Sequence, residues 1–259
     1  MIKFFRQIRQ KLLTENRFNK YLIYAIGEII LVVIGILIAL QVNNWNEARK
    51  NRNQEINFLS RIQADIKTDI ENISGSIRTN KSRMKRAEFL LASIDQPQLV
   101  KDSATYFIQS IEYAGYTNNP IISDNTFEEI KSSGKLSFIR NENLRSAIQE
   151  YYSWTSERGQ YNFILQDIQL NYLQERRGIL SAQQQINMGS FKQSKQYTIA
   201  EAKDVYSRMI KNSGFLELLP FTIQSQIRTG ESFESIKRQA IELNKMIEKE
   251  TTNKSILND

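Results

Sequence analysis

Two short patterns in this sequence have residue types that could do nucleophilic or acid–base chemistry. Ser132 and Lys135 form an S-x-x-K pattern, in which a lysine activates a serine nucleophile, but the chain has no K-T-G sequence to complete that set. The glycine between them is better explained as the residue that ends a short helix. Glu128 and Glu129 are adjacent, so a helix points their carboxylates about 100° apart and they cannot act as a pair. Neither pattern predicts an active site.

The residue types that the chain lacks exclude further chemistry. It has no cysteine, and therefore no disulfide, no thiolate nucleophile and no cysteine metal ligand. It also has no histidine, which is the commonest general base and zinc ligand. The sequence contains no Gly-rich phosphate loop. We therefore expect no enzymatic activity, no cofactor and no bound metal.

Aromatic residues crowd the stretch 151–163 and leave two interpretations open. They could line a ligand groove, or they could pack in the core and between helices, which is the commoner use of such side chains. The residues concerned are Tyr151, Tyr152, Trp154, Tyr161 and Phe163.

A single acid, Glu28, lies within an apolar run of 22 residues at positions 21–42. A helix of that length extends about 33 Å, which is enough to cross a bilayer core of roughly 30 Å. The run is longer than the apolar core of a signal peptide, and no small-x-small cleavage site follows it. The sequence therefore predicts one uncleaved transmembrane helix. An ionised carboxylate near the centre of such a helix costs about 2.5–3.5 kcal/mol, so Glu28 needs a partner.

The residues that share a helical face with Glu28 suggest that partner. Steps of three, four, seven and eleven residues return to nearly the same side of a helix. Small residues let a second helix approach, and phenol hydroxyls can hydrogen-bond the carboxyl group. We expect a helix–helix interface in which Glu28 is neutral or hydrogen-bonded; a proton or ion pathway is the alternative. The predicted interface consists of Tyr21, Tyr24, Glu28, Gly35 and Ala39.

Most of the net charge of +7 lies beside the predicted span. Residues 1–20 carry six basic residues and one acid, Glu15. Each basic residue there gains about 1 kcal/mol from anionic headgroups, so the charge indicates a lipid bilayer and not nucleic acid as the partner. This segment is either an amphipathic helix in the headgroup layer or an unstructured basic flank. The residues predicted at the membrane surface are Lys3, Arg6, Arg9, Lys11, Arg17, Lys20 and, at the far interface, Trp45.

Basic residues also predict the orientation of the span. Six precede it, whereas four lie in the twenty residues that follow it. The positive-inside bias then places the N-terminus in the cytoplasm and the rest of the chain in the periplasm, with the protein in the inner membrane.

After the span, a heptad pattern predicts a long helix over residues 43–96. Ten of twelve seam positions are apolar, and only Gln63 and Asn80 interrupt them. The helix either continues from the span or breaks just after it, and it ends before Pro97. The apolar seam consists of Ile56, Ile70, Ile77, Met84 and Leu91 at one heptad position and of Leu59, Ile66, Ile73, Ala87 and Ile94 at the other.

Basic residues cluster on this predicted helix over 78–86. They form either a solvated face or a docking patch for an acidic partner. The cluster consists of Arg78, Lys81, Arg83, Lys85 and Arg86.

The remaining sequence, 97–250, predicts a helical bundle, followed by a tail over 251–259 that should fray. The polar stretch 187–197 reads as a loop. Helices are expected over about 98–115, 125–133, 141–180, 199–212 and 214–228, and from Ser232 onward. Core positions expected within 141–180 are Leu144, Ile148, Tyr151, Tyr152, Ile164, Leu165, Ile168 and Leu173. The last helix should close against the first through Phe233, Ile236, Ala240, Leu243 and Ile247.

Two stretches of the chain resemble one known family. FFRQIRQKLLTENRFNKYLIYAIGEIILVVIGILIALQVNNWNEARK resembles the N-terminus of a widespread family of uncharacterised single-pass membrane proteins from Bacteroidota. TFEEIKSSGKLSFIRNENLRSAIQEYY resembles the second signature of that family. The resemblance implies a membrane location and a helical domain, and Glu28 lies inside the first stretch. It implies no activity, cofactor or catalytic residue.

These observations predict an all-α protein: a basic segment at 1–20, a transmembrane helix at 21–42, a long heptad helix and an extramembrane bundle. We expect it to act by protein–protein interaction or ligand sensing, in a scaffold or assembly role without catalysis. Its partner would be a second copy or another membrane protein. The alternative is a subunit of an ion- or proton-coupled membrane complex that uses Glu28.

Overall fold

The computed structural model describes residues 18–157, 159–189 and 195–255, and within these ranges every regular element is helical. This confirms the predicted all-α class. The elements are α2 (Phe18–Asp95), α3 (Gln98–Asp102), α4 (Ala104–Tyr113), α5 (Asn125–Ser132), the 3-10 turn η1 (Lys135–Phe138), α6 (Glu142–Glu157), α7 (Gly159–Glu175), α8 (Ala182–Met188), α9 (Ile199–Met209) and α10 (Ser213–Ser255). The chain forms two compact units, residues 1–56 and 57–259, and α2 contributes to both.

In the first unit, the part of α2 that ends at Val42 has apolar side chains all around its axis. The helix is long and apolar enough to cross a membrane, and its most apolar part is not covered by any described residue. Ile23 is 72% exposed and Leu31 is 71% exposed. Water disfavours such exposure by about 25 cal/mol for each Å² of apolar surface, whereas acyl chains do not. α2 continues without a break at Asn43 and Asn44.

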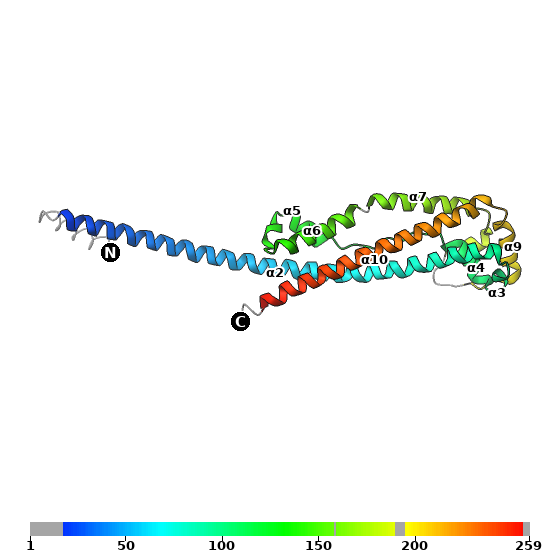
Figure 1. Cartoon of the computed structure of the whole chain (residues 1–259), viewed down its shortest axis with the longest axis horizontal. Helices are drawn as coiled ribbons and strands as arrows, with labels where there is room; N and C mark the ends of the chain where they lie inside the picture. Colours follow the sequence, from blue (N-terminus) through cyan, green and yellow to red (C-terminus); the bar gives the residue numbers. More distant parts are fainter. Residues whose placement is uncertain (1–17, 158, 190–194, 256–259) are drawn as a thin grey trace. The chain divides into compact units, whose positions relative to one another are not determined.

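In the second unit, the second half of α2 packs along α6 and α10. Figure 1 shows α10 running beside this half of α2 in the opposite direction. The five side chains expected to close α10 against the first helix are all buried, so that prediction is confirmed. They belong to a hydrophobic cluster that also includes Leu59, Ile62, Ile66 and Ile73 of α2.

A second hydrophobic cluster surrounds the end of α2. It combines Ala87 and Leu90 with buried residues of α3, α4, α9 and the first turns of α10. Its largest fully buried side chain is Tyr172 of α7, which donates a hydrogen bond to Ile111 O at 3.1 Å.

Between the two clusters, the buried side chains of α2 and α10 are polar. We call this region the polar belt. It consists of Asn80 on α2 and Thr222, Ser225, Gln226 and Thr229 on α10.

The burial of α2 corrects one of the two predicted seam positions. The heptad position of Leu59, Ile66 and Ile73 is buried as expected. The other predicted position is covered only in part, and Leu91 is 36% exposed. The second buried position of α2 is instead the one that lies three residues after Leu59, Ile66 and Ile73 in each heptad. It holds Ile62, Asp69, Ser76 and Leu90, which are all buried. Asp69 and Ser76 interrupt the apolar residues at that position, so a search for apolar repeats does not find it.

Several helix boundaries also differ from the predicted ones. Ser103 leaves the helical region and divides 98–115 into α3 and α4. In the stretch 141–180, α6 and α7 lie on either side of residue 158 and α7 ends at Glu175, earlier than expected, whereas α8 extends into the stretch expected to be a loop. The helices expected on either side of residue 230 are one helix, α10, which tolerates Pro220 at an exposed position and continues past Thr251.

Within the expected core of 141–180, Leu144, Ile148 and Leu165 are buried, as are both tyrosines. The prediction that Ile164 belongs to the core is wrong, because its side chain is exposed. Ile168 and Leu173 are half-buried.

Candidate functional site: a groove between α2 and α10

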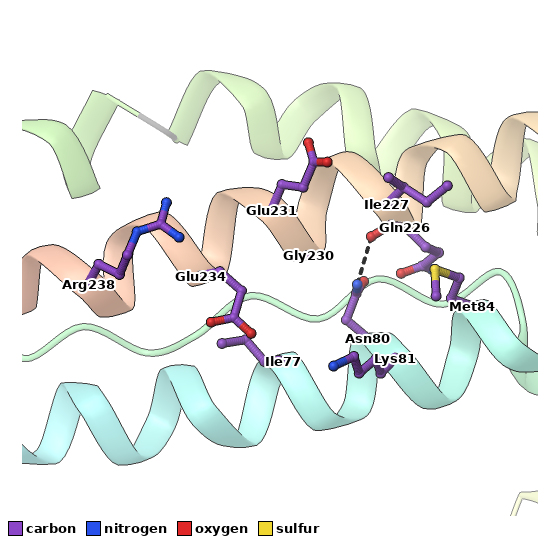
Figure 2. A pocket seen from close by; sticks show the side chains of 10 residues that line it. All are labelled: Ile77, Asn80, Lys81, Met84, Gln226, Ile227, Gly230, Glu231, Glu234 and Arg238. Carbon is purple, nitrogen blue, oxygen red and sulfur yellow. Dashed lines mark hydrogen bonds between the residues drawn. The ribbon is translucent and has the colours of Figure 1, made fainter.

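An open groove of about 580 Å³ lies over the polar belt, between α2 and α10. Figure 2 shows that both helices contribute side chains to it. The lining residues are Ile77, Asn80, Lys81 and Met84 from α2, and Gln226, Ile227, Gly230, Glu231, Glu234 and Arg238 from α10.

Amide side chains make the floor of the groove. Asn80 Nδ2 donates to the backbone oxygen of Gln226 at 2.7 Å, a contact drawn in Figure 2. Gln226 Nε2 in turn donates to Tyr116 O at 3.2 Å, and the Arg83 guanidinium donates to the same oxygen at 3.2 Å. A Cβ atom on Gly230 would lie 3.1 Å from Asn80 Nδ2, so the glycine leaves room for this amide. The floor is therefore tied to both helices and to the chain that leaves α4.

Apolar side chains form the walls of the groove. Ile77 is almost fully buried, Met84 is half-buried, and Ile227 is 45% exposed. These residues extend the hydrophobic surface of the bundle to the open side of the groove.

Charged side chains form its two rims. Lys81 lies on the α2 rim, whereas Glu231, Glu234 and Arg238 lie on the α10 rim. None of the four forms an ion pair with another residue that the structure describes. The groove thus combines an apolar wall with charges that have no partner inside the described chain.

A buried carboxylate, Asp69, fixes the segment before α5 to α2. Asp69 Oδ1 accepts the Ser123 N–H at 2.7 Å, and Oδ2 accepts the Tyr151 hydroxyl at 2.9 Å. Tyr152 donates to Ser123 O at 3.2 Å. Burial raises the pKa of Asp69 above its ordinary value, although these hydrogen bonds and that of the Ser123 side chain act in the opposite direction. Burial and the nearby Asp69 also raise the pKa of Tyr151. The cluster acts as a structural connection between α2, α6 and the segment before α5.

A buried ion pair performs a similar task at the other end of the unit. Arg176 pairs with Glu112 and donates to Glu112 O at 3.1 Å, and the Tyr116 hydroxyl donates to Glu112 Oε1 at 2.9 Å. Burial lowers the pKa of Arg176, but the hydrogen bond and charge of Glu112 outweigh it, so the net pKa is raised.

The S-x-x-K pattern does not form a catalytic arrangement. Ser132 Oγ donates to Glu129 O at 3.1 Å, and Glu129 itself pairs with Arg61 across to α2. Gly134 has a φ of 69°, which confirms it as the left-handed residue after α5. The chain also contains an S-D-N triplet at 123–125, but Ser123 uses its backbone in the Asp69 cluster. No described group of three or more metal-ligating side chains converges either.

The basic cluster on α2 divides into two sets. Arg83 and Arg86 turn inward: Arg83 donates to Tyr116 O, and the Arg86 guanidinium carbon lies 4.6 Å from the ring centroid of Tyr106. Arg78, Lys81 and Lys85 are exposed. Only these three exposed residues can belong to the predicted solvated face or docking patch. The position of Lys81 on the groove rim was not expected.

The aromatic stretch 151–163 divides as well. Tyr151 and Tyr152 lie in the core, and Trp154 packs against it half-buried. The side chains of Tyr161 and Phe163 lie outside the described part of the chain. The core interpretation therefore holds for the three described residues.

The predicted interface in the span stays a prediction. Gly35 and Ala39 are exposed, and nothing lies within 4 Å of a Cβ atom built on Gly35. Glu28 is half-buried. The side chains of Lys20, Tyr21 and Tyr24 lie outside the described part of the structure. Trp45 is exposed, with the Arg49 guanidinium carbon 5.5 Å from its ring centroid. The remaining residues predicted at the membrane surface lie outside the described residues, namely Lys3, Arg6, Arg9, Lys11 and Arg17.

Comparison with known families matches residues 28–219 to one family model, described as Family of unknown function (DUF6090). No curated protein and no solved structure matches the chain. The match begins at Glu28 and ends within α10 at Leu219, so it includes the α2 side of the groove and not its α10 side.

Proposed function

The chain belongs to the DUF6090 family, whose function is unknown, and from its physical chemistry we propose that it is a membrane-anchored interaction protein without catalytic activity. α2 anchors it through one span, and the helical unit at 57–259 binds a partner protein at the α2–α10 groove. The observation that carries this proposal is the groove itself: apolar walls and unpaired rim charges, over a floor that internal hydrogen bonds keep in place.

Two features support binding and not catalysis at this groove. Asn80 and Gln226 use their amides to hold the floor together, and neither amide is a general base or nucleophile. The rim charges lie at the opening, where they select a partner more readily than they activate a substrate.

Copurification in a mild detergent tests the interaction. The tagged full chain should retain a stoichiometric partner, either a second copy or another membrane protein, and Ile227→Lys should lose it because a lysine places a charge on the apolar wall. Ile186→Lys is the matched control, since Ile186 is 71% exposed on α8. Recovery of the chain alone, as a monomer, would contradict the proposal.

We place the anchor in the inner membrane, with the helical unit in the periplasm. The excess of basic residues before the span supports this orientation. A reporter fused after Asp259 that is active only in the periplasm tests it. Activity of a cytoplasmic reporter at the same position would reverse the orientation and leave the groove as the interaction site.

An ion- or proton-coupled complex that uses Glu28 is the second candidate. It is favoured by a half-buried acid within the apolar part of α2, where charge is costly. Glu28→Gln separates the two candidates. A coupled complex should lose transport in this variant, whereas a protein that acts only through the groove should keep its partner and its function.

A further inference from the structure

We propose that the partner at the groove is a second copy of this chain, with α2 of each copy lying against α10 of the other. The proposal rests on the proposed interaction function and adds the identity of the partner and the symmetry of the contact.

The charges on the two rims differ in sign. Lys81 lies on the α2 rim, and the exposed Arg78 and Lys85 lie next to it on the same helix. Glu231 and Glu234 lie on the α10 rim. One rim is therefore basic and the other acidic, so the groove carries the charges that complement its own.

The direction of the symmetry axis decides which rims meet. Two identical grooves can face each other through a two-fold axis that runs along the groove or through one that runs across it. An axis across the groove places α2 on α2 and brings Lys81 against Lys81. An axis along the groove places α2 on α10 and brings Lys81 against Glu231 of the second copy. Charge complementarity selects the axis along the groove.

Arg238 is the one basic residue among those of α10 that line the groove. It follows Glu234 by one helical turn and lies farther from Lys81, because α2 and α10 run in opposite directions and meet where Asn80 contacts Gln226 and Gly230. The α10 charges nearest to Lys81 along the groove are therefore the acids Glu231 and Glu234.

The apolar walls fit this arrangement. Met84 on α2 and Ile227 on α10 of one copy would face Ile227 and Met84 of the other. Both side chains retain exposed surface in the single chain, and the contact would cover it.

Crosslinking between two differently tagged full-length copies tests the pairing. The chain has no cysteine, so introduced cysteines report a single contact. A short bismaleimide in native membranes should join a Met84→Cys copy to an Ile227→Cys copy. Two Met84→Cys copies should react at least fivefold less, and a Lys203→Cys copy, modified at an exposed position of α9, should not react. Equal reaction of all pairs, or of none, would overturn the proposal.

Exchanging the charges of Lys81 and Glu231 tests whether the two rims meet. This second experiment still tests the pairing if one cysteine variant fails to fold. Copies that carry Lys81→Glu place like charges together at both symmetric contacts, as do copies that carry Glu231→Lys. Each variant alone should lose about tenfold in crosslinked dimer, because both contacts become repulsive. A mixture of the two variants restores opposite charges at both contacts and should return to within about twofold of the unmodified chain.

A mixture that crosslinks no better than either variant alone would overturn the pairing. If the copies do not crosslink but another membrane protein copurifies and is lost in Ile227→Lys, this inference fails and the proposed function stands. If no protein copurifies either, both fail.

Discussion

The two halves of α2 belong to one helix, but their side chains suit different surroundings. In the first half, apolar residues cover every side of the helix up to Val42, and none of this most apolar part is buried within the described protein. In the second half, apolar residues occupy one side, and the same buried side also holds Asp69, Ser76 and Asn80. Among the described residues, the most apolar part of α2 thus has no fully buried polar side chain, whereas the second half has several.

This difference reflects which partners each half has for its polar atoms. A lipid core offers no hydrogen bonds, so an isolated span must satisfy its backbone internally and keep polar side chains rare. The bundle brings other helices and backbone carbonyls to α2, so a buried amide or carboxylate there finds a donor or acceptor. The four predictions below test this comparison.

Charges in the first half should have the largest effect. Ile30→Lys, Ile34→Lys and Leu37→Lys together place three cations on the apolar segment, at a total cost of about 8–10 kcal/mol by insertion scales. The triple variant should leave the membrane fraction on carbonate washing, as measured by fractionation and immunoblotting.

The matched control places lysines on the exposed side of the second half, at Ala64, Ser82 and Glu88. This variant should remain in the membrane fraction. Release of both variants, or of neither, would remove the distinction between the two halves.

Close packing should matter only in the bundle. A Cβ atom on Gly115 would overlap the ring of the fully buried Tyr172. Gly115→Ala should therefore lower the free energy of unfolding by about 3 kcal/mol, measured by denaturant titration of the full chain in detergent. Gly35→Ala in the first half meets no described atom and should leave that value unchanged. Equal effects at the two glycines would contradict this.

The buried carboxylate should give the bundle a characteristic pH dependence. Because the pKa of Asp69 is raised in the folded state, the folded protein binds this proton more tightly than the unfolded chain does. The associated stability is present below the ordinary pKa of aspartate and is lost as pH rises through the raised value.

Asp69→Asn should remove this dependence. The amide oxygen can still accept the Ser123 N–H, and the amide nitrogen can donate to the Tyr151 hydroxyl oxygen. The free energy of unfolding of the wild type, relative to the variant, should fall between pH 4 and pH 8. A relative rise over that range would show that the carboxylate is stabilised in its charged form.

The smallest expected effect on stability compares an inward-facing with an exposed basic residue in the second half of α2. Arg86→Gln removes a cation that stacks over Tyr106 and lies 5.7 Å from the ring centroid of Tyr113, and it should lower the free energy of unfolding by about 1 kcal/mol. Lys85→Gln, one residue away and exposed, should change it by less than about 0.5 kcal/mol. Thermal unfolding measured side by side resolves the two. Equal effects would mean that Arg86 contributes no more than a surface charge.

Features that depend on neighbouring residues follow from the sequence alone. The apolar run identifies the segment able to span a membrane, because that property depends on about 20 consecutive side chains and no distant contact. Gly134 ends α5, and Asn141 Oδ1 accepts the Leu144 N–H at 3.1 Å to cap α6, because each acts within one helical turn. The apolar spacing after Ser232 likewise predicts the buried side of that part of α10 correctly.

Tertiary structure alone decided which polar residues of α2 turn inward and where the groove lies. Asp69 is separated by 82 residues from Tyr151, and Asn80 by 146 residues from Gln226. A polar side chain is stable in the interior only when such a distant group is brought to it, and periodicity does not reveal that group. Proximity along the chain therefore placed Lys81 and Arg86 in one basic cluster, whereas packing directed Arg86 into the protein and left Lys81 on the rim.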